Sequence, residues 1–157
     1  MSENVLLGLG SSLGDRNRHL QLALRFLKVH KDIHISQISR IYKSVPLGRA
    51  DSLFWNLCCI VETAFSPKEL LYVVKDIEEK VGRKRARRWS NRVIDIDILL
   101  FGSDSFCDRT LTIPHPQFCS RSFVLQPALE IAGEWFHPQK ECLIKDLPIP
   151  KPRCWCN

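Results

Sequence analysis

The sequence predicts an α+β fold with a ferredoxin-like βαββαβ outline, in which helices pack against a mainly antiparallel central sheet. Strand-type and helix-type apolar patterns follow one another in the order β-α-β-β-α-β, and a further helical pattern comes after them. Two strand-type segments are adjacent in the chain, which favours antiparallel pairing and helices gathered together. The length of 157 residues suits one domain, so we expect a single domain over 1–157.

The first elements are a strand, a turn and a helix. The apolar run 5–9 predicts a short strand. The glycines of 8–14 predict a tight turn after it. Their spacing is G-x-G-x-x-x-G, which matches neither the dinucleotide-binding pattern nor the P-loop. Leucines at helical spacing then predict a helix, for which Asp15 is a suitable N-cap.

Two strands and a second helix come next. Residues 33–42 and 55–65 have β-type patterns and are separated by a loop over 45–53. The stretch 66–69 is a capping box, because a serine precedes a proline and a glutamate follows three residues after that serine. The predicted helix runs to about Val81 and ends at the glycine that follows.

The last third begins with the clearest strand of the chain. Residues 93–101 are nearly all apolar apart from two aspartates. The stretch 104–116 is expected to be a loop with a short extended piece. A third helix is predicted from about Ser122 to Ile131, and the proline-rich stretch 138–157 is expected to be weakly structured.

Composition excludes several classes of protein. The chain is 45% hydrophobic, too apolar for a disordered tail, and it contains no apolar run long enough to span a membrane. We expect no signal peptide at its start. Seven cysteines without a framework spacing are typical of reduced thiols, so we expect a cytoplasmic protein. The pair Cys154 and Cys156 lacks the spacing and the partners of a zinc site.

The net charge of +6 is concentrated in one segment. Residues 82–92 contain six arginines and lysines and no acid, so the rest of the chain is neutral. Such a segment favours an anionic partner. Arginine forks match phosphate oxygens, and several together suit a polyphosphate. The alternatives are a solvated basic surface, or a nucleic-acid patch on which Trp89 stacks against a base.

Two acidic residues follow directly after that segment. On a strand, Asp95 and Asp97 share one face and lie about 6.5–7 Å apart at Cα, while Ile94, Ile96, Ile98 and Leu100 face a core on the other side. Paired carboxylates among apolar residues favour metal binding, and two Mg²⁺ ions held in this way are typical of phosphoryl chemistry. The alternative is a solvated pair, or a pair bridged to the nearby arginines.

With these features in place, the chain resembles the 6-hydroxymethyl-7,8-dihydropterin pyrophosphokinases of folate biosynthesis over nearly its whole length. The segments that carry the resemblance are Leu9–Arg16, Pro46–Gly48, Phe54–Asn56, Gly82–Arg85, Arg88–Arg92, Asp95–Gly102, Leu111–Pro116 and Arg121–Leu125. The resemblance implies transfer of the pyrophosphoryl group of ATP to the hydroxymethyl group of the pterin, which gives AMP and the pterin diphosphate. It implies a monomer that binds ATP and the pterin and neither nucleic acid nor membrane, with a possible partner enzyme of the folate pathway.

The resemblance also implies roles for individual residues. Two Mg²⁺ ions are expected on Asp95 and Asp97. Arg83, Arg92 and Asp97 match catalytic positions. The residues that match ATP-binding positions are Glu78, Arg85, Arg88, Trp89, Arg92, Ile98, Thr112, His115 and Arg121. Those that match the pterin slot are Ser44, Val45, Leu47, Phe54, Asn56, Trp89 and Phe123.

Two other classes of function remain open at this point. A small RNA-binding module would use the basic segment and Trp89, but it has no use for the two aspartates. It would show steeply salt-dependent binding that ATP does not displace. A nucleotidyltransferase with paired aspartates would release pyrophosphate instead of AMP.

Overall fold

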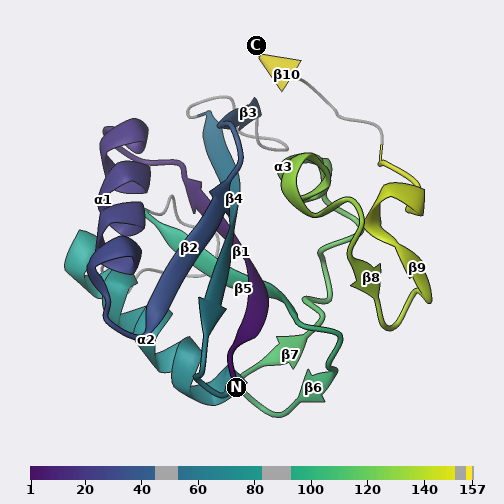
Figure 1. Cartoon of the computed structure of the whole chain (residues 1–157). Helices are drawn as coiled ribbons and strands as arrows, with labels where there is room; N and C mark the ends of the chain where they lie inside the picture. Colours follow the sequence, from purple (N-terminus) through teal and green to yellow (C-terminus); the bar gives the residue numbers. More distant parts are fainter. Residues whose placement is uncertain (45–52, 83–92, 151–154, 157) are drawn as a thin grey trace.

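The centre of the molecule is an antiparallel sheet (Figure 1). The structure is a computed structural model and describes residues 1–44, 53–82 and 93–150, with the backbone of 155–156. The strands of the sheet are β1 (Glu3–Ser11), β2 (Ile33–Ile38), β3 (Tyr42–Ser44), β4 (Phe54–Thr63), β5 (Asp95–Phe101) and β10 (Trp155–Cys156). Their order is β10-β3-β4-β1-β5, and β2 pairs with a different part of β4. The antiparallel sheet expected from the sequence is confirmed.

Helices cover both faces of this sheet. The helices α1 (Arg16–Val29) and α2 (Pro67–Val81) pack side by side on one face, and α3 (Ser122–Ala132) packs on the other (Figure 1). The described residues also form two small hairpins and a 3₁₀ turn: β6 (Phe106–Cys107) with β7 (Thr112–Ile113), β8 (Phe136–His137) with β9 (Cys142–Leu143), and η1 (Ile144–Asp146).

The helix ends follow the local sequence. The Asp15 carboxylate accepts a hydrogen bond from the Arg18 amide at 3.1 Å and begins α1. At α2, Ser66 and Glu69 form the expected capping box, because each side chain accepts a hydrogen bond from the other residue's backbone amide. Gly82 ends α2 at a φ of 125°, a conformation that side chains disfavour. These predictions are confirmed.

The sheet separates two apolar cores. On the α1–α2 side, Ile94, Ile96 and Ile98 of β5 pack with buried residues of both helices. On the α3 side, Leu6, Leu99 and Leu100 pack with α3 and η1. The expectation that Leu100 faces the same core as the three isoleucines is wrong. The register shifts between Leu6 and Leu7, and this irregularity reverses the alternation of β5 after Ile98.

Three stretches differ from expectation. Gly8 and Gly10 lie inside β1, because the strand extends to Ser11 and pairs with a neighbour on each side. The strand expected over 33–42 divides into β2 and β3. Residues 138–150 are more regular than their prolines suggest: they carry β9 and η1 and bury Ile144 in the α3-side core.

Candidate active site

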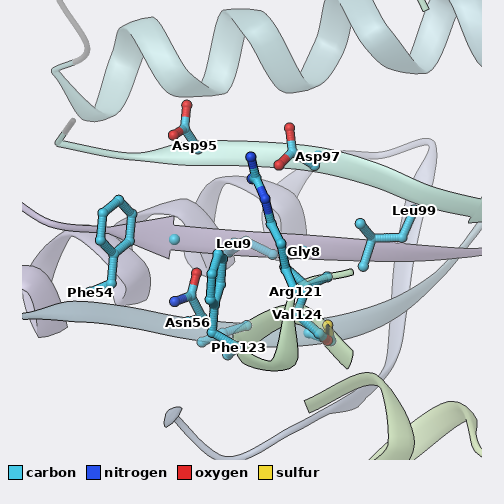
Figure 2. A pocket seen from close by; sticks show the side chains of 13 residues that line it. Gly8, Leu9, Phe54, Asn56, Asp95, Asp97, Leu99, Arg121, Phe123 and Val124 are labelled. Atoms are coloured by element: carbon cyan, nitrogen blue, oxygen red, sulfur yellow. Dashed lines mark hydrogen bonds between the residues drawn. The ribbon is translucent and has the colours of Figure 1, made fainter. Parts of the chain in front are cut away.

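A pocket opens on the α3 face of the sheet, where β1, β4, β5 and the start of α3 meet (Figure 2). The space inside it amounts to about 440 Å³ when the part open to solvent is counted. The residues that line it are Gly8, Leu9, Gly10, Phe54, Asn56, Leu57, Cys58, Asp95, Asp97, Leu99, Arg121, Phe123 and Val124.

The two aspartates occupy one side of this pocket. Asp95 pairs with Gly10 across β1–β5, and Asp97 pairs with Gly8. Their carboxylates therefore leave the strand on the same face, as the sequence predicts, and Figure 2 shows them side by side above β1. Both are hard oxygen donors of the kind that Mg²⁺ prefers, and two carboxylates are the usual protein contribution to such a site.

The surroundings of Asp97 raise the pKa of its carboxyl above the ordinary value. The main cause is burial, and the negative charge of Asp95 adds to it. The charges of His115, Lys75 and Arg121 act in the opposite direction. A cation in the pocket would relieve the repulsion between the two carboxylates, so the electrostatics of the pair suit a metal ion.

An arginine and two aromatic rings face the aspartates. Arg121 precedes the first residue of α3, and its side chain extends across β1 towards the side of the pocket that holds the aspartates (Figure 2). Phe123 stacks on Phe54 with ring centroids 6.3 Å apart and an angle of 27° between the planes. A flat ring between two others needs two contacts of about 3.5 Å, so a small separation of the rings would admit a heterocycle.

Asn56 supplies the polar group next to the aromatic pair. Its side chain is only 8% exposed, and its Nδ2 is buried without a hydrogen-bond partner among the described residues. A buried amide donor without a partner costs free energy. A ligand that offers an acceptor at this point would remove that cost, so Asn56 is suited to bind the edge of a polar ring.

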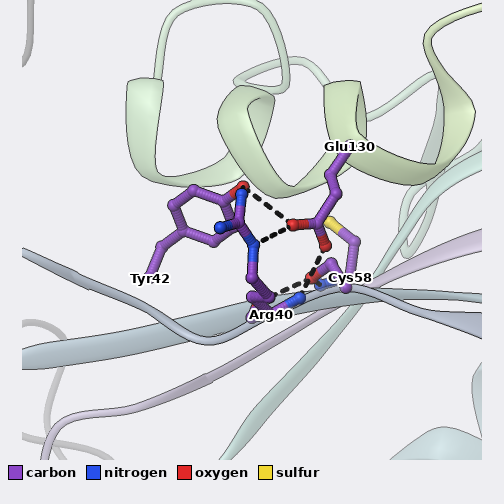
Figure 3. A network of polar contacts seen from close by, with 5 residues as sticks. Arg40, Tyr42, Cys58 and Glu130 are labelled. Carbon is purple, nitrogen blue, oxygen red and sulfur yellow. Dashed lines mark hydrogen bonds and ion pairs between the residues drawn. The ribbon is translucent and has the colours of Figure 1, made fainter. Parts of the chain in front are cut away.

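A polar network ties α3, and with it Arg121 and Phe123, to the sheet (Figure 3). The Glu130 carboxylate accepts hydrogen bonds from the backbone amide of Arg40 at 2.6 Å, from its guanidinium at 2.5 Å, and from the Tyr42 hydroxyl at 3.2 Å. Nearer the pocket, the Cys58 thiol donates to the carbonyl oxygen of Val124 at 3.8 Å. Helix and sheet are therefore joined at two points.

Glu78 lies on the opposite face from the pocket. This side chain of α2 is almost fully buried, and its Oε1 accepts a hydrogen bond from the Ile96 amide at 2.7 Å. Ile96 lies between the two aspartates in the chain, and its amide is on the edge of β5 that has no neighbouring strand among the described residues. Glu78 thus supports the strand that carries the carboxylates, a contact that its sequence position does not reveal.

The remaining predicted site residues are partly separated from the pocket. His115 lies near Asp97, and burial and the charge of Arg121 lower the pKa of its imidazole, whereas Asp97 raises it. Ser44 is buried in β3, opposite Phe54 in the register. Ile98 packs in the α1–α2 core and Thr112 lies in β7. The predicted residues outside the described part of the chain are Val45, Leu47, Arg83, Arg85, Arg88, Trp89 and Arg92.

Comparison with known proteins decides the family. A family model for 7,8-dihydro-6-hydroxymethylpterin-pyrophosphokinase (HPPK) matches residues 6–133. The chain belongs to the HPPK family. It is 37% identical over 135 residues to the 2-amino-4-hydroxy-6-hydroxymethyldihydropteridine pyrophosphokinase of Bacillus subtilis, with 85% of this chain and 81% of that protein covered. The same enzyme of Aquifex aeolicus is 38% identical over 135 residues, with coverage of 85% and 83%.

Longer proteins also contain an HPPK part. The bifunctional protein FolKE of Lactococcus lactis is 34% identical over 148 residues, and the match covers 91% of this chain and 42% of that protein. A crystal structure of Plasmodium falciparum HPPK-DHPS shares the fold with a TM-score of 0.75 and 18% identity, over 94% of this chain and 43% of that one. HPPKs are ATP-dependent transferases of folate biosynthesis, so this chain is a kinase of that class.

Sequence reasoning missed some residues of the HPPK pocket. Gly8, Gly10 and Cys58 line it, but the two glycines suggested a turn and Cys58 suggested only a buried thiol. No group of three or more His, Cys, Asp or Glu side chains that could hold a metal ion occurs within the described ranges. In the same ranges no helix combines the length and the apolarity needed to cross a membrane.

Proposed function

We propose that the pocket between β5 and α3 is where this chain transfers the pyrophosphoryl group of ATP to 6-hydroxymethyl-7,8-dihydropterin. The hydroxymethyl oxygen attacks the β-phosphorus, a new P–O bond forms, and the bond to the α-phosphate oxygen breaks. The products are AMP, the pterin diphosphate and a proton. The observation that carries the proposal is that one pocket contains an acidic pair, an arginine, two aromatic rings and the side-chain amide of Asn56, whose Nδ2 has no hydrogen-bond partner among the described residues.

The acidic pair is assigned to the metal. Asp95 and Asp97 fit Mg²⁺ because they are adjacent oxygen donors on one face, and Asp97 is desolvated enough for its pKa to rise. We propose two Mg²⁺ ions at this pair. When bound, the ions neutralise negative charge on the triphosphate. Asp97 is also the carboxylate we assign to accept the hydroxyl proton, because it lines the pocket in which the hydroxymethyl group would be held.

The aromatic slot is assigned to the pterin. Phe54 and Phe123 offer their faces to a flat heterocycle, and Asn56 offers a buried donor to its edge. The rest of the proposed pterin site is Ser44, Val45, Leu47 and Trp89. We propose that a pterin bound in this slot points its hydroxymethyl group towards the aspartates. Such positioning of the reacting groups is what a phosphoryl transfer chiefly needs.

The cations are assigned to the phosphates. Arg121 lines the same pocket as the aspartates and the rings, so we assign its charge to the transferring phosphates of ATP. We assign Arg83 and Arg92 to the same task. The remaining proposed ATP contacts are Glu78, Arg85, Arg88, Trp89, Ile98, Thr112 and His115. Glu78 and Ile98 lie on the far side of β5, so a contact from either to ATP is the least supported by the geometry.

Product analysis tests the proposal. The protein is incubated with Mg²⁺ and ATP, with and without the reduced pterin, and the nucleotides are separated. AMP is expected only when the pterin is present, in a one-to-one ratio with pterin diphosphate. Release of pyrophosphate would indicate nucleotidyl transfer, and AMP formed without pterin would indicate hydrolysis; either result would overturn the assignment.

Two finer expectations belong with this proposal. We propose that β1, α1, β2, β4, α2 and β5 follow a ferredoxin-like outline, which the position of β1 between β4 and β5 supports. We also propose that the chain acts as a monomer and hands its product to a further folate enzyme, because related HPPK parts are joined to other enzymes in bifunctional proteins.

A further inference from the structure

The floor of the pocket is a strand without side chains on the pocket side. Gly8 pairs with Asp97 on β5 and with Cys58 on β4. Two residues further along, Gly10 pairs with Asp95 on β5 and with Asn56 on β4. Because side chains alternate along a strand, both glycines face the pocket between the acidic pair and the aromatic slot. Glycine weakens a strand, so its presence at two alternate positions calls for a reason.

At position 10, a glycine is required because the Asn56 side chain lies directly over it. A Cβ built on Gly10 would lie 2.6 Å from Asn56 Oδ1 and 3.7 Å from its Cγ. Real Cβ atoms do not approach an oxygen so closely. The carboxamide of Asn56 therefore occupies the space that any side chain at position 10 would need. Its Nδ2 has no hydrogen-bond partner in the described structure, so this placement keeps a donor available for a ligand.

We infer that Gly10 positions the ligand-binding amide of the pocket: its bare Cα gives the Asn56 carboxamide the room to lie across β1 and present its amide to the edge of a flat, polar heterocycle. The inference rests on the proposed function for the identity of that heterocycle. Gly10 itself is a positioning residue, because it acts through Asn56. An alanine at this position would force the carboxamide to turn, since the Asn56 side chain is the neighbour that can move.

Gly8 provides a matched comparison on the same face of the same strand. A Cβ there would meet Leu99 Cδ1 at 3.2 Å, Cγ at 3.5 Å and Cδ2 at 3.6 Å. Leu99 belongs to the α3-side core, and its side-chain tip has to move by only a few tenths of an ångström. The same glycine-to-alanine change is therefore predicted to disturb ligand recognition at Gly10 more than at Gly8.

A double-mutant cycle tests the inference. KM values for ATP and for the reduced pterin, and kcat, are measured for the wild type and for Gly10→Ala, Gly8→Ala, Asn56→Ala and Gly10→Ala/Asn56→Ala. Gly10→Ala is expected to raise the KM for pterin about 10- to 100-fold, because one amide hydrogen bond to the ligand is lost. The KM for ATP should stay within about twofold. In the Asn56→Ala background the alanine at position 10 should add almost nothing.

A measurement without ligand separates this inference from the proposed function. The side-chain NH₂ resonances of Asn56 in the free protein should shift in Gly10→Ala and stay close to their wild-type positions in Gly8→Ala. Unchanged resonances in Gly10→Ala would overturn the inference whatever the substrate is. A wild-type protein that does not turn over the pterin would refute the proposed function instead.

Two further results would also refute the role of Gly10. One is a loss in the double variant equal to the product of the single losses, since this would show that Gly10 acts independently of Asn56. The other is an equal loss in Gly8→Ala and Gly10→Ala. If Gly10→Ala alone unfolds, the double variant must fold, because removing the carboxamide makes room for the new methyl group; failure of both to fold would contradict the proposed contact.

Discussion

Replacing Asp97 by asparagine separates a role in catalysis from a role in stability. Asparagine has nearly the same shape, so β5 and its register with Gly8 should persist. The loss of a charge about 4 Å from a cation costs about 4 kcal/mol at an effective dielectric constant of 20. On the scale of rates this is about 10³-fold. We therefore expect kcat for AMP formation to fall by about 10³-fold or more.

The stability of the same variant should move in the opposite direction. Burial raises the pKa of Asp97, so the folded state disfavours the ionised carboxylate. The ionised Asp97 carboxylate therefore lowers the free energy of unfolding at neutral pH. This destabilisation disappears as the pH falls below the ordinary pKa range of carboxyl groups, because the group is then protonated in both the folded and the unfolded state. Asp97→Asn should thus unfold at the same denaturant concentration as the wild type, or a higher one, at pH 7, with the difference shrinking in acid.

Asp104 provides the control for the Asp97 variant. Asp104→Asn changes an exposed carboxylate just beyond the end of β5 and should leave both activity and stability near wild type. Rates come from single-turnover AMP formation at saturating substrates, and stability comes from urea unfolding. If Asp97→Asn retained more than a tenth of the wild-type rate, or lost both stability and activity, the assignment of Asp97 to the metal would be wrong.

Three further predictions concern the slot and the frame. Phe123→Leu should raise the KM for pterin about 5- to 10-fold with little change for ATP, measured by steady-state kinetics, because one face of the stack with Phe54 is lost. Asp108→Asn should lower Tm at pH 7, since Lys68 and backbone amides hold the pKa of this carboxyl well below its usual range; the difference should vanish as the pH falls through that depressed pKa, and a difference that grows in acid would contradict the assignment. Ser66→Ala should lower the free energy of urea unfolding by about 1 kcal/mol, and an unchanged midpoint would argue against the capping box.

The local sequence pattern predicted the acidic pair correctly, whereas features that depend on how distant strands pair could not be predicted. The alternation of Asp95 and Asp97 with isoleucines has a period of two, so it revealed which face the carboxylates occupy. It failed at Leu100 because the register shift opposite Leu6 and Leu7 depends on how β5 meets β1. No property of β5 alone contains that information.

The same limit applies to the rest of the site. Gly8 and Gly10 suggested a turn, because glycines favour turns locally, but pairing on both sides of β1 keeps them in a strand. The resemblance placed Phe54 and Phe123 in one slot, whereas only the packing of α3 shows how they stack. Ile144 lies in a proline-rich stretch and is nevertheless buried, since composition does not reveal a late hairpin that packs on a core.

The position of β1 has a consequence for hydrogen exchange. This strand pairs with β4 and β5 over most of its length and contributes residues to both cores. Its amides can open only when the sheet itself separates, so they should exchange at rates set by the free energy of global unfolding. A substrate that binds only the folded protein raises the free energy of unfolding by an amount that depends on its concentration and Kd. Exchange along β1 should slow by the factor that corresponds to this increase, so the exchange rates of these amides report the affinity of the ligand.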